Sequence, residues 1–224
     1  MKIKYGMSGG HLSRAGNIIE NWTRSYFPTL RNAFIMTLIT SIPAAEYLLS
    51  AKAVQSSPDQ LLVHYEFTNN SSSSVYLFNR LARLGGASVF DTDPNTVNII
   101  LTADRVTVGK TLLPLPVDKE VERQYVPCMT HVAPHETYQE SILCNLPLLP
   151  FTWYASRPMR RTPVQRPLFF ELGYTVASSD TEKLVQLLDT EDGPLYCANW
   201  FPIKLQSVIT SGLLLPEVTV LSER

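Results

Sequence analysis

Charged residues make up only 17% of this 224-residue chain, and its cysteines number three. The low charge argues against a helical bundle, whose exposed faces need many Glu and Lys side chains. A net charge of −1 offers no basic surface for nucleic acid. What the chain has instead is 45% apolar residues, 16 prolines and 10 tyrosines, which is typical of a β protein with a full core and many turns.

Signatures of catalysis and of bound cofactors are missing as well. The sequence has no Gly-x-Ser-x-Gly elbow, no phosphate-binding loop and no Cys-x-x-Cys pair. His131 and His135 are four residues apart, but Pro134 between them prevents the helix that would turn both imidazoles toward one metal ion. The sequence therefore predicts no catalytic residue, no metal and no cofactor.

The first 53 residues differ in charge from the rest of the chain. They hold six basic and two acidic residues, a balance of +4, whereas residues 54–224 hold 13 basic and 18 acidic residues, a balance of −5. An apolar run over residues 33–49 follows the basic region, and Ala51 and Ala53 come next. Basic region, apolar run and small residues are the order of a secretory signal, so we expect cleavage after Ala53 and export to the periplasm or the cell exterior.

Two other interpretations of this leader stay open. One is an extension that packs on the domain as an apolar helix or lacks fixed structure. The other is a membrane anchor, although Pro43 and Glu46 interrupt the run, and a spanning helix needs about 20 apolar residues. The membrane is thus a predicted partner only through this N-terminal segment, and only if the segment is not cleaved.

All three cysteines lie in the part of the chain that follows the leader. In an oxidising compartment one pair of Cys128, Cys144 and Cys197 can form a disulfide and leave one free thiol. The alternative is three small buried side chains, which is common for cysteine. Cys144 shares a strand face with Ile142 and Leu146, so the pattern places it in the core.

Alternating apolar residues predict a single β domain over residues 54–224. The Ser179-x-x-Glu182 spacing of a capping box predicts one short helix over residues 180–189. Several short strands with one helix and frequent turns favour an immunoglobulin-like antiparallel β-sandwich. The expected strands, about eight, are 63–67, 75–78, 87–90, 97–101, 106–108, 138–146, 168–176, and one or two closing strands over 213–215 and 218–221, with the first two forming a hairpin.

The region from about 147 to 167 is predicted to be a long loop rich in proline and arginine. Arg157, Arg160, Arg161 and Arg166 lie within ten residues of one another, after Trp153. Arginine forks bind carboxylates and phosphates with two hydrogen bonds, and prolines reduce the entropy lost when a loop is ordered. These five residues are the predicted partner-binding site, and an acidic protein or an anionic surface is the predicted partner.

Two functions remain in competition at this point. The absence of catalytic motifs favours an exported, non-enzymatic binding or structural accessory domain. The alternative is a secreted hydrolase or carbohydrate-active enzyme that uses acidic residues at the loop end of the sandwich, which requires two carboxylates to converge in a deep cleft. The carboxylates to examine are Asp91, Asp93, Glu120, Glu122, Glu136 and Glu140.

Overall fold

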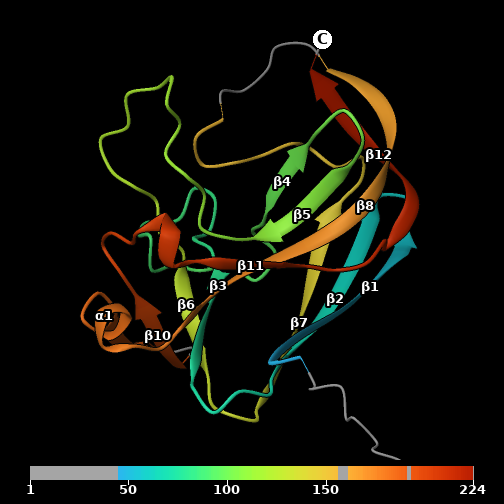
Figure 1. Cartoon of the computed structure of the whole chain (residues 1–224). Helices are drawn as coiled ribbons and strands as arrows, with labels where there is room; N and C mark the ends of the chain where they lie inside the picture. Colours follow the sequence, from blue (N-terminus) through green and yellow to red (C-terminus); the bar gives the residue numbers. More distant parts are fainter. Residues whose placement is uncertain (1–44, 156–160, 191–192, 224) are drawn as a thin grey trace, which may run out of the picture. The chain divides into compact units, whose positions relative to one another are not determined.

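The computed structural model describes residues 45–155, 161–190 and 193–223, and this part of the chain is mostly β, as predicted (Figure 1). A three-stranded sheet has the order β1-β2-β7. A larger sheet has the order β4-β5-β8-β3-β6-β10-β9, with β11 and β12 also paired to β8. The strands are β1 (Tyr47–Ser57), β2 (Gln60–Asn69), β3 (Val75–Arg80), β4 (Asn98–Leu101), β5 (Val106–Lys110), β6 (Cys128–Val132), β7 (Thr137–Asn145), β8 (Arg161–Val176), β9 (Gln186–Thr190), β10 (Gly193–Cys197), β11 (Ser207–Thr210) and β12 (Leu215–Glu223).

The core lies between the two sheets. In β2, every second side chain from Leu61 to Phe67 is fully buried, while the residues between them are exposed. The buried side chains pack against apolar residues of the larger sheet, and the rings of Tyr65 and Phe170 stack with centroids 4.7 Å apart. The period-two pattern that predicted β2 therefore forms one wall of a sandwich-like core.

The hairpin expected from residues 63–67 and 75–78 does not form. These residues lie in β2 and β3, which belong to different sheets. The buried Asn69 side chain fixes the crossing between them. Its amide nitrogen donates to the backbone oxygens of Ser73 and Ala133, at 2.9 and 3.0 Å, and its oxygen accepts from Ser71. The polar run after Asn69 is thus a crossover between sheets.

The prediction of a wholly antiparallel sandwich is wrong at one ladder. β5 and β8 pair in parallel, from Val106 opposite Leu168 to Lys110 opposite Leu172. The long loop predicted up to residue 167 is also too long, since β8 begins at Arg161 and pairs with β12. Pro163 and Pro167 argued against a strand in the sequence, because proline is rare in strands. Pro167 lies opposite the register shift in β12, where the ladder tolerates a missing N–H.

The helix is shorter than expected and uses a different cap. α1 spans Ser179–Glu182, and its N-terminal hydrogen bonds come from Ser178 and Thr181. The apolar residues that follow are not helical: Leu184 and Val185 lie in a turn and the segment after it, and Leu187 and Leu188 belong to β9, which pairs with β10 along its whole length. Ladder hydrogen bonds to β10 therefore override the helical spacing of these residues. The segment 87–90, expected as a strand, is a bend and turn.

The first strand crosses the predicted boundary between residues 53 and 54. β1 pairs with β2 over most of its length, with Ala51 opposite Tyr65 and Ala53 opposite Val63. Both alanines are half-buried against the core, which gives the small side chains a packing role. The sheet thus begins at Tyr47. Residues 1–44 lie outside the described residues, and cleavage after Ala53 stays a prediction that now implies cutting β1.

The described residues contain no helix with the length and apolar character needed to cross a membrane.

Cys144 lies in the core, as its strand face indicated. Its side chain is 5% exposed and packs beside Ile142 in β7. Burial raises the pKa of the thiol to about 11, so little thiolate, the reactive form, exists near neutral pH. We expect native Cys144 to resist iodoacetamide at neutral pH and to label rapidly after unfolding, as measured by peptide mass spectrometry. Rapid native labelling would contradict the register of β7.

Candidate binding cleft beside the disulfide

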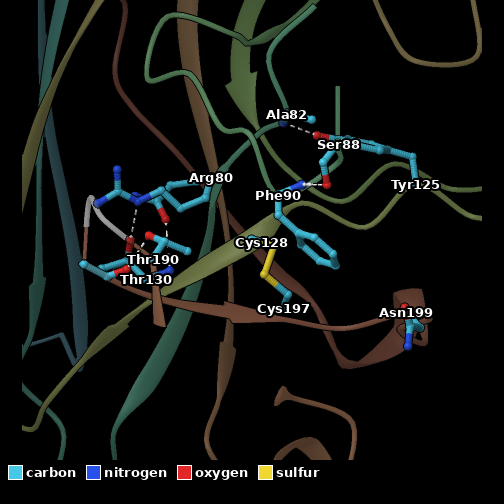
Figure 2. Close-up of a disulfide and its surroundings, with 12 residues drawn as sticks. Arg80, Ala82, Ser88, Phe90, Tyr125, Cys128, Thr130, Thr190, Cys197 and Asn199 are labelled. Atoms are coloured by element: carbon cyan, nitrogen blue, oxygen red, sulfur yellow. Dashed lines mark hydrogen bonds between the residues drawn. A yellow bond between two sulfur atoms is a disulfide. The ribbon is translucent and has the colours of Figure 1, made fainter. Parts of the chain in front are cut away.

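Cys128 in β6 and Cys197 in β10 form a disulfide, and this settles which cysteines pair (Figure 2). Both residues are buried, with their Cα atoms 4.3 Å apart. Hydrogen-bonded pairing between β6 and β10 is limited to Tyr196 opposite Met129. The disulfide therefore supplies much of the connection between the β9–β10 hairpin and the rest of the larger sheet.

A cleft of about 230 Å³ opens next to this disulfide. Figure 2 shows the Phe90 ring close to the two sulfur atoms, with Tyr125 and Asn199 from other segments around it. Val89 and Phe90 are 45% and 43% exposed, so part of this apolar lining faces solvent. The lining comes from four separate segments: Val89, Phe90, Arg123, Gln124, Tyr125, Val126, Cys128, Trp153, Ala198 and Asn199.

Two stacked rings give the cleft a rigid aromatic wall. The rings of Tyr125 and Trp153 have centroids 4.1 Å apart, and Phe151 meets Trp153 edge-on at 6.0 Å. The Tyr125 hydroxyl accepts a 2.6 Å hydrogen bond from the Ala82 N–H, which is drawn in Figure 2. Burial raises the pKa of Tyr125, so the phenol stays neutral. Both rings are fixed before any ligand arrives.

The polar lining of the cleft contains one cation. Arg123 donates a 2.7 Å hydrogen bond to Asn199 Oδ1, and within the described residues it pairs with no carboxylate. The neighbouring Gln124 side chain is fully occupied, because it bonds both the N–H and the carbonyl of Phe201. A bound anion can therefore replace Asn199 as the partner of Arg123, whereas Gln124 holds the wall in place.

The two predicted arginines that the structure describes, Arg161 and Arg166, do not lie together. Arg157 and Arg160 lie outside the described residues. Arg161 and Arg166 are five positions apart on β8, so their side chains point to opposite faces of the strand. Arg166 lines a separate hollow of about 380 Å³, and its buried Nε makes no hydrogen bond. Of the three predicted residues that the structure describes, Trp153 is the one that lines the cleft.

Sequence reasoning missed Arg123, Phe90 and Asn199, which join Trp153 in the cleft. They come from loops far apart in the chain, and no local spacing relates them. The cysteines were the usable signal. A bond between Cys128 and Cys197 brings Arg123, five residues before Cys128, close to Asn199, two residues after Cys197. The histidines have other surroundings: His131 packs between Tyr76 and Tyr196, and His135 occupies a turn with a φ of 62°.

The carboxylates on which the enzyme alternative depends do not share a deep cleft. Asp91 and Asp93 both face Arg83, with the nearest oxygens 3.1 and 3.9 Å from its nitrogens. Glu120 and Glu122 line a shallow hollow outside the aromatic wall. The other two have separate surroundings: Glu136 accepts from the Ala133 N–H at 2.8 Å, and Glu140 is buried, with Lys110 2.6 Å away. No two of these six carboxylates therefore face each other across a cleft in the described part of the chain, which is the arrangement that glycoside hydrolysis uses.

Comparisons of the chain with protein-family models, with curated proteins and with solved structures found no match.

Proposed function

We propose that the chain is an exported, non-enzymatic binding module on an immunoglobulin-like sandwich, and that its cleft binds an acidic segment of a protein partner. The observation that carries the proposal is the fixed Tyr125–Trp153 wall with Arg123 beside it in a cleft bounded by the disulfide. Rigid aromatic rings and arginine are the side chains that contribute most to protein interfaces, because little conformational entropy is lost when they bind.

The disulfide supports the compartment. Disulfides persist in oxidising environments such as the periplasm and the cell exterior, and they are rare in the cytosol. The basic leader and apolar run before the domain have the order of a secretory signal. Two independent features of the chain therefore agree with export.

The size of the cleft supports a protein partner over a small molecule. Pockets for drug-sized ligands enclose roughly 300–1,000 Å³, whereas this cleft holds about 230 Å³, which suits one anchoring side chain. The exposed Val89 and Phe90 extend the apolar surface around it. A carboxylate next to the anchor would take two hydrogen bonds from Arg123. The proposed ligand is thus a segment with an apolar or aromatic side chain beside an acidic one.

The test compares two variants of the cleft. The immobilised full chain is used to capture its partner from the envelope fraction of the native host, and the affinity of that partner is then measured for each variant. We expect Trp153→Ala to weaken binding about 30-fold or more, as a buried aromatic anchor contributes at least ~2 kcal/mol. Arg123→Gln should weaken it less and make it less sensitive to salt.

Arg161→Gln is the matched control, because it removes an exposed arginine of the originally predicted site and leaves the cleft intact. Its partner affinity should equal that of the wild type. Thermal melting of each variant separates lost binding from lost folding. A strong effect of Arg161→Gln together with unchanged binding in the two cleft variants would reject the cleft and favour the arginine segment.

A further inference from the structure

A group of polar side chains is buried between the two sheets, where apolar side chains normally pack. Lys110 of β5 and Asn79 of β3 have no exposed surface, and the side chain of Glu140 in β7 is 8% exposed. Each lies on the strand face that also carries core residues: Val108 for Lys110, Leu77 for Asn79 and Ile142 for Glu140. An amine and a carboxylate thus meet in an apolar interior, at the backbone of a buried asparagine.

The contacts place the amine against both other residues. Lys110 Nζ lies 2.6 Å from Glu140 Oε2 and donates at 3.0 Å to the backbone oxygen of Asn79. The Tyr65 hydroxyl donates to the same Glu140 oxygen at 2.7 Å, and the Tyr138 hydroxyl donates to the other at 3.3 Å. Glu140 is therefore held rigidly beside the amine.

The carboxamide of Asn79 is bonded unevenly. Its oxygen accepts a 3.1 Å hydrogen bond from the Thr130 N–H, which polarises the carbonyl. Its nitrogen, Nδ2, is buried without a hydrogen bond. Buried amide groups normally have partners at both ends, so an unpaired one calls for an explanation. Acyl transfer from an amide requires a carbonyl oxygen whose developing negative charge is stabilised, and the Thr130 N–H can supply that stabilisation.

We propose that Lys110 and Asn79 form an intramolecular amide cross-link, with Glu140 carrying the protons. Glu140 first takes a proton from the Lys110 ammonium. The Nζ lone pair then forms a bond to Asn79 Cγ, and the carbonyl π electrons move to Oδ1, where the Thr130 N–H stabilises the negative charge. Nζ gives up a second proton as the Cγ–Nδ2 bond breaks. The departing nitrogen takes up both protons and leaves as ammonium, and Glu140 ends as the carboxylate.

The surroundings favour the first step of this reaction. Burial lowers the pKa of Lys110, while Glu140 acts in the opposite direction, so the neutral amine is more accessible than for a solvated lysine. The core excludes water, which protects the reacting carbonyl from hydrolysis. The fixed contacts of Lys110 with Glu140 and with the Asn79 backbone reduce the entropy cost of bringing amine, amide and proton carrier together. The product would tie β3 to β5 covalently, in addition to the disulfide.

The test is peptide mapping of the full chain by mass spectrometry after folding and incubation at neutral pH. We expect a branched peptide in which the segments around Asn79 and Lys110 are joined, with a mass lower by one ammonia than the sum of the two. Trypsin should not cleave after Lys110. The Glu140→Gln variant should give two separate linear peptides of full mass and normal cleavage after Lys110, because it lacks the proton carrier.

Lys183→Met provides the matched control, since Lys183 also faces a carboxylate, Asp180 at 3.4 Å, but is exposed. The branched peptide should persist in this variant. Separate full-mass peptides from the wild type would overturn the proposal. So would a loss of ammonia confined to a linear Asn79 peptide, because that is the mark of succinimide formation. Neither outcome would affect the proposed binding cleft.

Discussion

Replacing Cys128 and Cys197 together by alanine is expected to lower the free energy of unfolding by about 2–5 kcal/mol, the usual loss when a native disulfide is removed from a small secreted domain. The disulfide joins residues 69 positions apart, and β10 otherwise meets β6 through a single residue pair. Leu195 and the half-buried Leu188 pack mainly around the two cysteines, in a cluster separate from the main core. Loss of the bond therefore frees the β9–β10 hairpin first.

Urea unfolding followed by tryptophan fluorescence measures this change, and the reduced wild type should behave like the double variant. The cleft should suffer more than the main core, because Cys128, Ala198 and Asn199 form part of its lining. Partner affinity is thus expected to fall even under conditions where the core remains folded. A double variant with an unchanged urea midpoint and unchanged affinity would show that the hairpin is held by packing alone.

Period-two patterns predicted the strands whose two faces differ clearly. β2 and β7 alternate buried and exposed residues, and apart from Glu140 the inward residues are apolar or aromatic, or cysteine, over 61–67 and 138–144, so most could be read from spacing. β3 and β5 are buried on both faces, which left their alternation weak. β1 escaped notice because its small inward residues, Ala51 and Ala53, resemble a signal-peptidase site.

The candidate site was harder to predict than the fold. Trp153 was selected for its place near four arginines, yet the structure puts it beside Arg123, thirty positions earlier in the chain. Contacts of this kind depend on the paths of loops between sheets, and no local pattern encodes them. The buried Lys110–Glu140 pair could not be predicted from the sequence either, because lysine and glutamate side chains in strands are ordinarily exposed to solvent.

Replacing Glu140 by alanine is expected to cost about 3–5 kcal/mol of unfolding free energy, because it leaves a buried charge without its partner. Lys110 would keep its hydrogen bond to the Asn79 backbone but lose the carboxylate 2.6 Å away. Tyr65 would lose the acceptor of its hydroxyl as well. This loss is expected whether or not Lys110 is cross-linked to Asn79 in the wild type. Glu140→Ala lacks the group that would carry the protons, so Lys110 stays a free buried amine in the variant. Glu66→Ala on the exposed face of β2 is the control, and it should change the stability by no more than about 0.5 kcal/mol.

The pH dependence of this variant gives a second measure. Burial already lowers the pKa of Lys110 from 10.5, and without Glu140, which opposes that effect, the pKa falls further. The unfolded chain then binds more protons than the folded one between the lowered pKa and 10.5, so the stability of Glu140→Ala should rise with pH in that window. Urea titrations at several pH values, from neutral upward, should show the gap to the wild type narrowing. A gap that stays constant or widens would mean that Lys110 reaches solvent once Glu140 is removed, and that the space between the sheets is less closed than its buried lysine indicates.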